Sequence, residues 1–164
     1  MKVDRIRDLL KEVRSGKIKV EEALEKLKVL PYQDLGFAKI DTHRELRRNY
    51  PEVIFCPGKT PEQIVHIAER MRENKSTVMA VRVNREIYQA IKNSLPEVRY
   101  FEKAKIAVLG ERKEKVSPHT ILVVSGGTAD MPVAEEAAVT AEIMNNKVDR
   151  LYDVGVAGIH RLFD

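Results

Sequence analysis

The chain has 164 residues, of which 43% are hydrophobic and 33% are charged. This composition excludes an intrinsically disordered chain and predicts a packed globular fold. The single cysteine, Cys56, excludes an intramolecular disulfide, and no apolar run reaches the roughly 20 residues that a membrane span needs. The sequence therefore predicts a cytoplasmic protein that does not enter the membrane.

The positive charge is concentrated in the first part of the chain. Residues 1–117 carry a net charge of +8, whereas residues 118–164 carry −4. A basic surface suits a polyanion such as nucleic acid or a nucleotide pyrophosphate, although composition alone favours an ordinary solvated surface. We expect no nucleic-acid partner, because four Phe and five Tyr do not make an aromatic stacking platform.

Helical and strand patterns alternate through the first two-thirds of the chain. Ser15 and Gly16 interrupt the first helical pattern, so a pair of short amphipathic helices is expected at the start. Thr60 followed by Pro61 begins a helix, as does Asn84, because these side chains cap a first turn. The predicted helices are 3–13, 20–27, 61–71 and 84–94, and the predicted strands are 52–56, 77–83, 98–101 and 105–109.

A charged segment that ends in proline, residues 110–118, is predicted to be a linker or a long exposed turn. It divides the chain into an N-terminal α/β domain, residues 1–117, and a second domain, residues 118–164. The second domain shows a βαβ pattern with a glycine-rich turn after its first strand. Its predicted elements are strand 120–124, helix 132–144 and strand 149–156.

The fold class is therefore α/β, and the second domain resembles the first βαβ unit of a doubly wound parallel sheet. Its first strand is a continuous apolar run, which predicts burial on both faces. Because two parallel strands cannot cover both of their faces, we expect the sheet to be incomplete in these 164 residues, in a sequence truncated at its C-terminus.

The glycine-rich turn after strand 120–124 is the first candidate site. Gly126 and Gly127 permit close backbone approach, and the following helix start offers N–H groups to an anion. Asp130 is expected to bond a ribose hydroxyl, whereas Glu135 and Glu136 are expected to complement the helix dipole. The turn matches neither common nucleotide-binding motif, G-x-G-x-x-G or the P-loop.

The second candidate site follows strand 149–156, where His160 and Arg161 are adjacent. In a parallel sheet this position lies beside the glycine-rich turn. The pair could supply a proton-transfer group and a phosphate clamp, or it could be a solvated pair beyond a strand end. The residues alone leave both interpretations open.

Three segments of the sequence together resemble the LarB family. They are DLGFAKIDTHRELRRNYPEVIFCPGKTPEQIV, SGGTADMPVAEEAAVTAE and VDRLYDVGVAGIHRLF. The second and third are similar to LarB's catalytic domain, which is itself similar to aminoimidazole ribonucleotide carboxylase (PurE). The first is similar to the N-terminal domain of LarB, which PurE lacks. The resemblance therefore covers both predicted domains and nearly the whole chain.

This resemblance implies a role in nickel-pincer cofactor biosynthesis. LarB carboxylates nicotinic acid adenine dinucleotide at pyridinium C5, with carbon dioxide or bicarbonate as co-substrate. A cysteine thiolate adds at C4 and makes C5 nucleophilic, and its later expulsion restores the aromatic ring. Hydrolysis of the phosphoanhydride, with Mg²⁺ as the expected helper and no prosthetic group, gives AMP and pyridinium-3,5-biscarboxylic acid mononucleotide.

The resemblance also assigns roles to individual residues. Asp130 and His160 take the catalytic positions, with His160 in proton transfer and Arg161 on phosphate. Ala129 replaces the serine that usually precedes this aspartate, which removes one hydroxyl donor. The substrate-binding positions are Ser125, Gly126, Gly127, Thr128 and Arg161, together with Asp41, Arg44, Arg47, Arg48 and Lys59 in the N-terminal domain; no metal ligand is expected.

The family's catalytic cysteine is absent from these 164 residues, which lack its Asn-Ser-Cys segment. Cys56 follows an apolar strand and is expected to be structural. The parent protein is thus expected to be an enzyme and this chain to be inactive alone. The alternatives are a non-catalytic dinucleotide-binding module and a PurE-like purine biosynthesis enzyme. The complete family is expected to form a homo-octamer.

Overall fold

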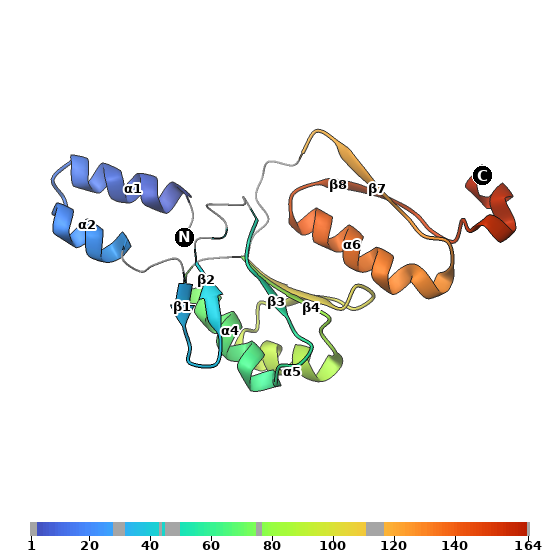
Figure 1. The fold of residues 1–164 in the computed structure, drawn as a ribbon, viewed down its shortest axis with the longest axis horizontal. Helices are drawn as coiled ribbons and strands as arrows, with labels where there is room; N and C mark the ends of the chain where they lie inside the picture. Colours follow the sequence, from blue (N-terminus) through green and yellow to red (C-terminus); the bar gives the residue numbers. More distant parts are fainter. Residues whose placement is uncertain are drawn as a thin grey trace.

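The computed structural model describes residues 3–27, 32–42, 44, 50–74, 77–110 and 117–163. Its main body is layered, with a pair of helices, a central sheet, one further helix and a two-stranded sheet following one another (Figure 1). The fold is α/β, as the sequence predicts. The helices are α1 (Val3–Arg14), α2 (Val20–Leu27), α4 (Pro61–Glu73), α5 (Arg85–Ser94) and α6 (Met131–Ile143), with 3₁₀ helices η1 (Thr128–Asp130) and η2 (Val156–Leu162). The strands are β1 (Tyr32–Asp34), β2 (Lys39–Asp41), β3 (Val53–Phe55), β4 (Val78–Val81), β5 (Arg99–Phe101), β6 (Ile106–Leu109), β7 (Thr120–Val124) and β8 (Lys147–Leu151).

The central sheet has the strand order β3-β4-β6-β5. Strands β3 and β4 are parallel, and β6 is antiparallel to both β4 and β5. Every residue of β4 and β6 is buried, because helices cover both faces of the sheet at these two strands. The predicted helix and strand pattern of this region is therefore confirmed, with strand ends that differ by one or two residues.

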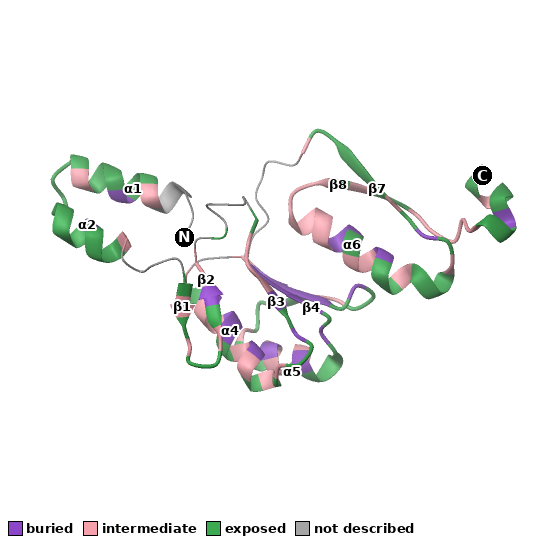
Figure 2. Cartoon of the chain, in the orientation of Figure 1, coloured by how far each residue is buried: buried purple, intermediate pink, exposed green. Residues whose placement is uncertain are grey.

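Helices α4 and α5 pack on one face of the central sheet, and Figure 2 shows the buried residues of this layer. Both helices begin at the predicted caps. The Thr60 hydroxyl accepts from the Gln63 N–H, and the Gln63 side chain accepts from the Thr60 N–H in return. The Asn84 side chain accepts from the N–H of Ile87. The core between these layers includes Ile64, Met71, Ile91, Ala107 and Leu109.

Helix α6 covers the opposite face of the central sheet. Val139, which is only 3% exposed, packs in one cluster with Met79 of β4 and Val108 of β6. Arg82, at the end of β4, forms an ion pair of 2.7 Å with Glu136 of α6. Helix α6 lies beyond the predicted domain boundary at residue 117, yet it completes the core of the preceding sheet. The position of that boundary stays a prediction.

The glutamates of α6 do not serve the helix dipole as expected. Glu135 and Glu136 lie beyond the first turn, where the dipole acts most strongly. Instead, Glu136 pairs with Arg82, and Glu135 lies 3.5 Å from the Arg150 guanidinium on β8. These pairs connect α6 to the sheets on its two sides.

Strands β7 and β8 are parallel, with Thr120 opposite Lys147 and Val124 opposite Leu151. The predicted burial of β7 on both faces is wrong for this chain. Ile121, Leu122 and Val124 are 41%, 57% and 53% exposed. Helix α6 packs on this pair, and much of the apolar surface of β7 stays uncovered among the residues that the structure describes. Strand β8 also ends at Leu151, earlier than predicted, because Asp153 adopts a left-handed backbone (φ 62°).

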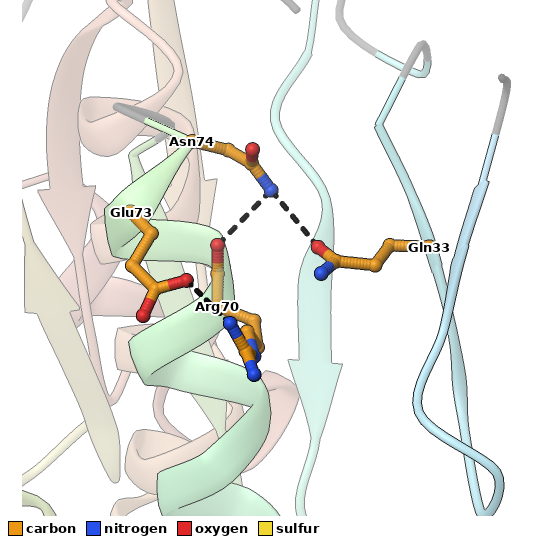
Figure 3. A network of polar contacts seen from close by, with 4 residues as sticks. All are labelled: Gln33, Arg70, Glu73 and Asn74. Carbon is orange, nitrogen blue, oxygen red and sulfur yellow. Dashed lines mark hydrogen bonds and ion pairs between the residues drawn. The ribbon is translucent and has the colours of Figure 1, made fainter. Parts of the chain in front are cut away.

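The β1–β2 hairpin was not predicted from the sequence. Its strands pair antiparallel, and Gly36 (φ 82°) lies in the turn between them. Asn74, at the end of α4, donates from its side-chain amide to Gln33 of β1 (3.2 Å) and to the Arg70 carbonyl (3.0 Å) (Figure 3). One amide thus joins the hairpin to the α4 terminus.

The predicted opening pair of helices is confirmed by α1 and α2. Most of the predicted linker, residues 111–116, lies outside the described residues. No helix in the described part of the chain is long and apolar enough to cross a membrane.

Candidate functional site

The structure brings the two candidate segments together at the carboxyl ends of β7 and β8. The Ser125 N–H donates to the Leu151 carbonyl (3.0 Å), and the Val154 N–H donates to the Ser125 carbonyl (3.1 Å). These bonds extend the parallel ladder beyond the last strand residues. The segment from Ser125 to Asp130, here called the glycine loop, therefore contacts Val154 and Gly155, which lead into the turn that carries His160 and Arg161.

Gly155 allows this close contact. A Cβ atom on Gly155 would lie 2.4 Å from the Gly126 carbonyl oxygen, closer than any real contact of this kind. The obstacle is backbone, so no side-chain rotation could relieve it. Gly155 was not predicted as a site residue, although a glycine inside the predicted strand 149–156 is a signal of close backbone approach that could have identified it.

Asp130 closes the glycine loop on itself. Its Oδ2 accepts from the Gly127 N–H (3.0 Å), and its own N–H donates to the Gly127 carbonyl (3.0 Å). The carboxylate thus holds the loop in shape at the start of α6. The expected ribose contact of Asp130 stays a prediction, and so do the ligand contacts of Gly126 and of the exposed Thr128.

Ser125 offers a hydroxyl that no described residue binds. The residue is 6% exposed, and its Oγ has no hydrogen-bond partner. A buried hydroxyl without a partner costs free energy, roughly 1–3 kcal/mol. A polar group of a ligand at the glycine loop would form a hydrogen bond with this hydroxyl. The family resemblance implies that the ligand lies at this position.

Arg161 is held within its own turn. Its Nη1 donates to Oδ2 of Asp153 (2.7 Å), and its Nε donates to the Gly158 carbonyl (3.3 Å). His160, one residue earlier, has an exposed side chain on η2. The turn therefore presents a fixed cation and an accessible imidazole beside the glycine loop.

The N-terminal site residues lie elsewhere. Asp41 ends β2, and Arg44 pairs with Glu52, just before β3, at 3.3 Å. Burial raises the pKa of Glu52 and outweighs the Arg44 charge, and its Oε2 is buried without a hydrogen-bond partner among the described residues. Lys59, beyond the far end of β3, donates to the Phe55 carbonyl (2.8 Å). Arg47 and Arg48 lie outside the described residues.

These positions divide the predicted ligand residues between the two ends of the central sheet. Glu136, near the start of α6, pairs with Arg82 after β4, whereas Glu142, near its end, lines a cavity with Thr77 before β4. The glycine loop therefore lies toward the carboxyl ends of β3 and β4. The cluster of Asp41, Arg44 and Glu52 lies at the opposite end.

Cys56 does not join either group of residues. It is 1% exposed, and burial raises the pKa of its thiol from 9.0 to about 11. A neutral buried thiol is a poor nucleophile at physiological pH. The structure thus agrees with the structural role expected for Cys56.

The comparison with protein families concerns the N-terminal part of the chain. Residues 32–112 match the family model of the LarB/PurE-like N-terminal domain. This part of the chain is therefore similar to that N-terminal domain. This confirms the resemblance to LarB, and it assigns the central sheet, α4, α5 and the β1–β2 hairpin to that domain.

The chain is also similar to an uncharacterized protein of Methanocaldococcus jannaschii. The two sequences are 32% identical over 167 aligned positions, which cover 96% of this chain. The likeness therefore continues past the N-terminal domain and through the glycine loop. The chain spans 64% of that relative's length.

Proposed function

We propose that this LarB-like chain supplies the dinucleotide-binding part of a carboxylase that acts on nicotinic acid adenine dinucleotide. The observation that carries the proposal is the pairing of a LarB/PurE-like N-terminal domain with a glycine loop that lies against a turn bearing a fixed arginine. The reaction would add carbon dioxide at pyridinium C5 and hydrolyse the phosphoanhydride to release AMP.

The residues at the carboxyl ends of β7 and β8 have chemistry that suits a phosphorylated ligand. Arg161 would bind a phosphate through charge-assisted hydrogen bonds, which its planar guanidinium makes with good geometry. The Ser125 hydroxyl, buried without a partner, would bond the same ligand. His160 is exposed in the same turn and would transfer a proton between the ligand and solvent.

The nucleophile of the proposed reaction is not Cys56. The reaction needs a thiolate that adds at C4 of the pyridinium ring and leaves after the C5 proton is lost. Cys56 is buried and its pKa is raised to about 11, so it would be neutral and inaccessible. The thiolate would come from a cysteine segment of the family type, which these 164 residues do not contain.

Mg²⁺ is the expected helper of the phosphoanhydride hydrolysis in this proposal. The described residues include no group of three His, Cys, Asp or Glu side chains arranged to hold one. Mg²⁺ in the assay would reach the site with the substrate's pyrophosphate.

The buried Cys56 favours a second candidate function for the chain by itself, a dinucleotide-binding module without catalysis. Both candidate functions predict that the chain binds the dinucleotide. They differ in whether a longer form of the protein, which includes the cysteine segment, also converts the dinucleotide to products. The test is incubation with nicotinic acid adenine dinucleotide, bicarbonate and Mg²⁺, followed by mass spectrometry for AMP and the biscarboxylated mononucleotide.

Residues 1–164 should give no product in this assay, whereas a form that includes the cysteine segment should give both products. Product from residues 1–164 would overturn the exclusion of Cys56 as nucleophile. A longer form that binds the dinucleotide without releasing AMP would contradict the carboxylase and leave the binding module.

A further inference from the structure

The Arg161 guanidinium is fixed from several sides by its own turn. Asp153 accepts from Nη1 at 2.7 Å, and the Gly158 carbonyl accepts from Nε at 3.3 Å. Two of the five N–H groups of the guanidinium are used in these bonds. The other three, one on Nη1 and two on Nη2, remain to bind a ligand.

Gly158 makes room for this arrangement. A Cβ atom at residue 158 would lie 2.7 Å from Nε and 2.9 Å from Nη2 of Arg161. The guanidinium therefore lies against the bare α-carbon of Gly158, and any larger residue would displace it. Gly158 itself is buried beneath the arginine side chain.

Asp153 occupies an unusual backbone position. Its φ of 62° lies in the left-handed region, which costs most residues free energy but is tolerated by Asp and Asn. This conformation ends the extended backbone of the strand and directs the carboxylate toward Arg161, eight residues later. Its neighbour Val154 bonds to Ser125, so the pair is attached directly to the glycine loop.

We propose that Asp153 and Gly158 are positioning residues that fix the Arg161 guanidinium for a phosphate of the substrate. This inference rests on the proposed function, in which Arg161 binds phosphate. A preoriented arginine loses less conformational entropy when the ligand binds, so the affinity is higher than with a mobile side chain. The phosphate would bind the N–H groups of Nη2, and Asp153 would keep its contact to Nη1.

The alternative geometry is competition, in which the Asp153 carboxylate occupies the place of the phosphate. Two features favour positioning. Asp153 contacts the guanidinium through Nη1 only, and the Gly158 carbonyl accepts from Nε, which leaves both N–H groups of Nη2 without a described partner. Its carboxylate is also 45% exposed, so solvent screens its repulsion of a bound anion.

The test is calorimetric titration of nicotinic acid adenine dinucleotide into the wild type and four variants. Arg161→Ala should weaken binding about tenfold or more, the scale of a lost charged hydrogen bond. Asp153→Asn keeps the side-chain shape and suits the left-handed backbone, and Gly158→Ala displaces the guanidinium. Each of these two should weaken binding about threefold to tenfold. Ile159→Ala, an exposed change in the same turn, is the matched control and should leave affinity unchanged.

A double variant separates positioning from a general effect on the turn. Asp153→Asn should have no further effect when Arg161 is already alanine, because its influence passes through that side chain. Equal or tighter binding by Asp153→Asn, with Arg161→Ala still weak, would overturn the inference and leave the proposed function intact. Wild-type affinity in Arg161→Ala would overturn the phosphate role of Arg161, and the inference with it. Unchanged thermal unfolding of each variant excludes loss of the fold as the cause.

Discussion

Arg82 and Glu136 connect two parts of the chain that the sequence pattern separates. Arg82 follows β4 of the LarB/PurE-like domain, and Glu136 lies in α6, directly after the glycine loop; their side chains meet at 2.7 Å. The Arg82 side chain is half exposed, so solvent screens the pair and its own contribution to stability should be small. The buried contact beside it, through Val139, contributes more.

Val139→Ala should destabilise the central sheet as well as α6. The side chain is 3% exposed and packs on Met79 and Val108, so its truncation leaves a cavity in their shared core. The expected loss is about 1–3 kcal/mol in the free energy of unfolding, measured by urea denaturation. Val133→Ala, at a 62% exposed position of the same helix, is the control and should change stability by less than about 0.5 kcal/mol. Equal effects of the two variants would show that α6 does not share this core.

Gly155→Ala should disrupt the contact between the glycine loop and the Arg161 turn. The new methyl group would overlap the Gly126 carbonyl oxygen, and the backbone would have to shift. We expect a loss of about 1–3 kcal/mol in stability, the usual range for overpacking. Gly127→Ala is the matched control for stability, because its φ of −149° suits alanine and its nearest neighbour would be 3.7 Å away. Thermal unfolding that does not separate these variants would contradict the described contact.

Cys56 should make stability fall at high pH. The pKa of the thiol is about 11 in the folded chain and 9.0 when solvated, so between these values the unfolded chain loses a proton that the folded chain keeps. The free energy of unfolding is therefore unaffected below pH 9 and falls by about 1–3 kcal/mol as the pH rises to 11.

This pH effect is measured by urea unfolding of the wild type and Cys56→Ala at pH 8 and pH 10.5. The lysines titrate in both proteins. The difference between the wild type and Cys56→Ala in how the free energy of unfolding changes with pH therefore isolates the effect of the thiol. Parallel pH profiles, or rapid alkylation of the native thiol at pH 8, would be inconsistent with its burial.

Local signals in the sequence predicted much of the fold. Thr60 and Asn84 cap helices as expected, because a cap depends on residues within one turn. The β1–β2 hairpin was missed, because its three-residue strands are too short for a clear alternation. The packing of α6 on the central sheet was also missed, since an apolar helix face does not specify which surface it meets.

The candidate site, like the fold, has features that the sequence predicts and features that it does not. The adjacency of the glycine loop and the Arg161 turn follows from parallel pairing, which a βαβ pattern predicts. The contact between Asp153 and Arg161 depends on a left-handed residue and on a missing Cβ at Gly158, and neither leaves a periodic signal. The exposure of β7 depends on which other elements pack against it, and the apolar run alone does not indicate whether such elements are present.

The most direct test of the central claim is a calorimetric titration of nicotinic acid adenine dinucleotide into residues 1–164 and into Arg161→Ala. Saturable binding by the wild type, weakened about tenfold or more in the variant, is the predicted result. No binding by the wild type, or equal affinity in both proteins, would contradict a dinucleotide site at the glycine loop and the Arg161 turn.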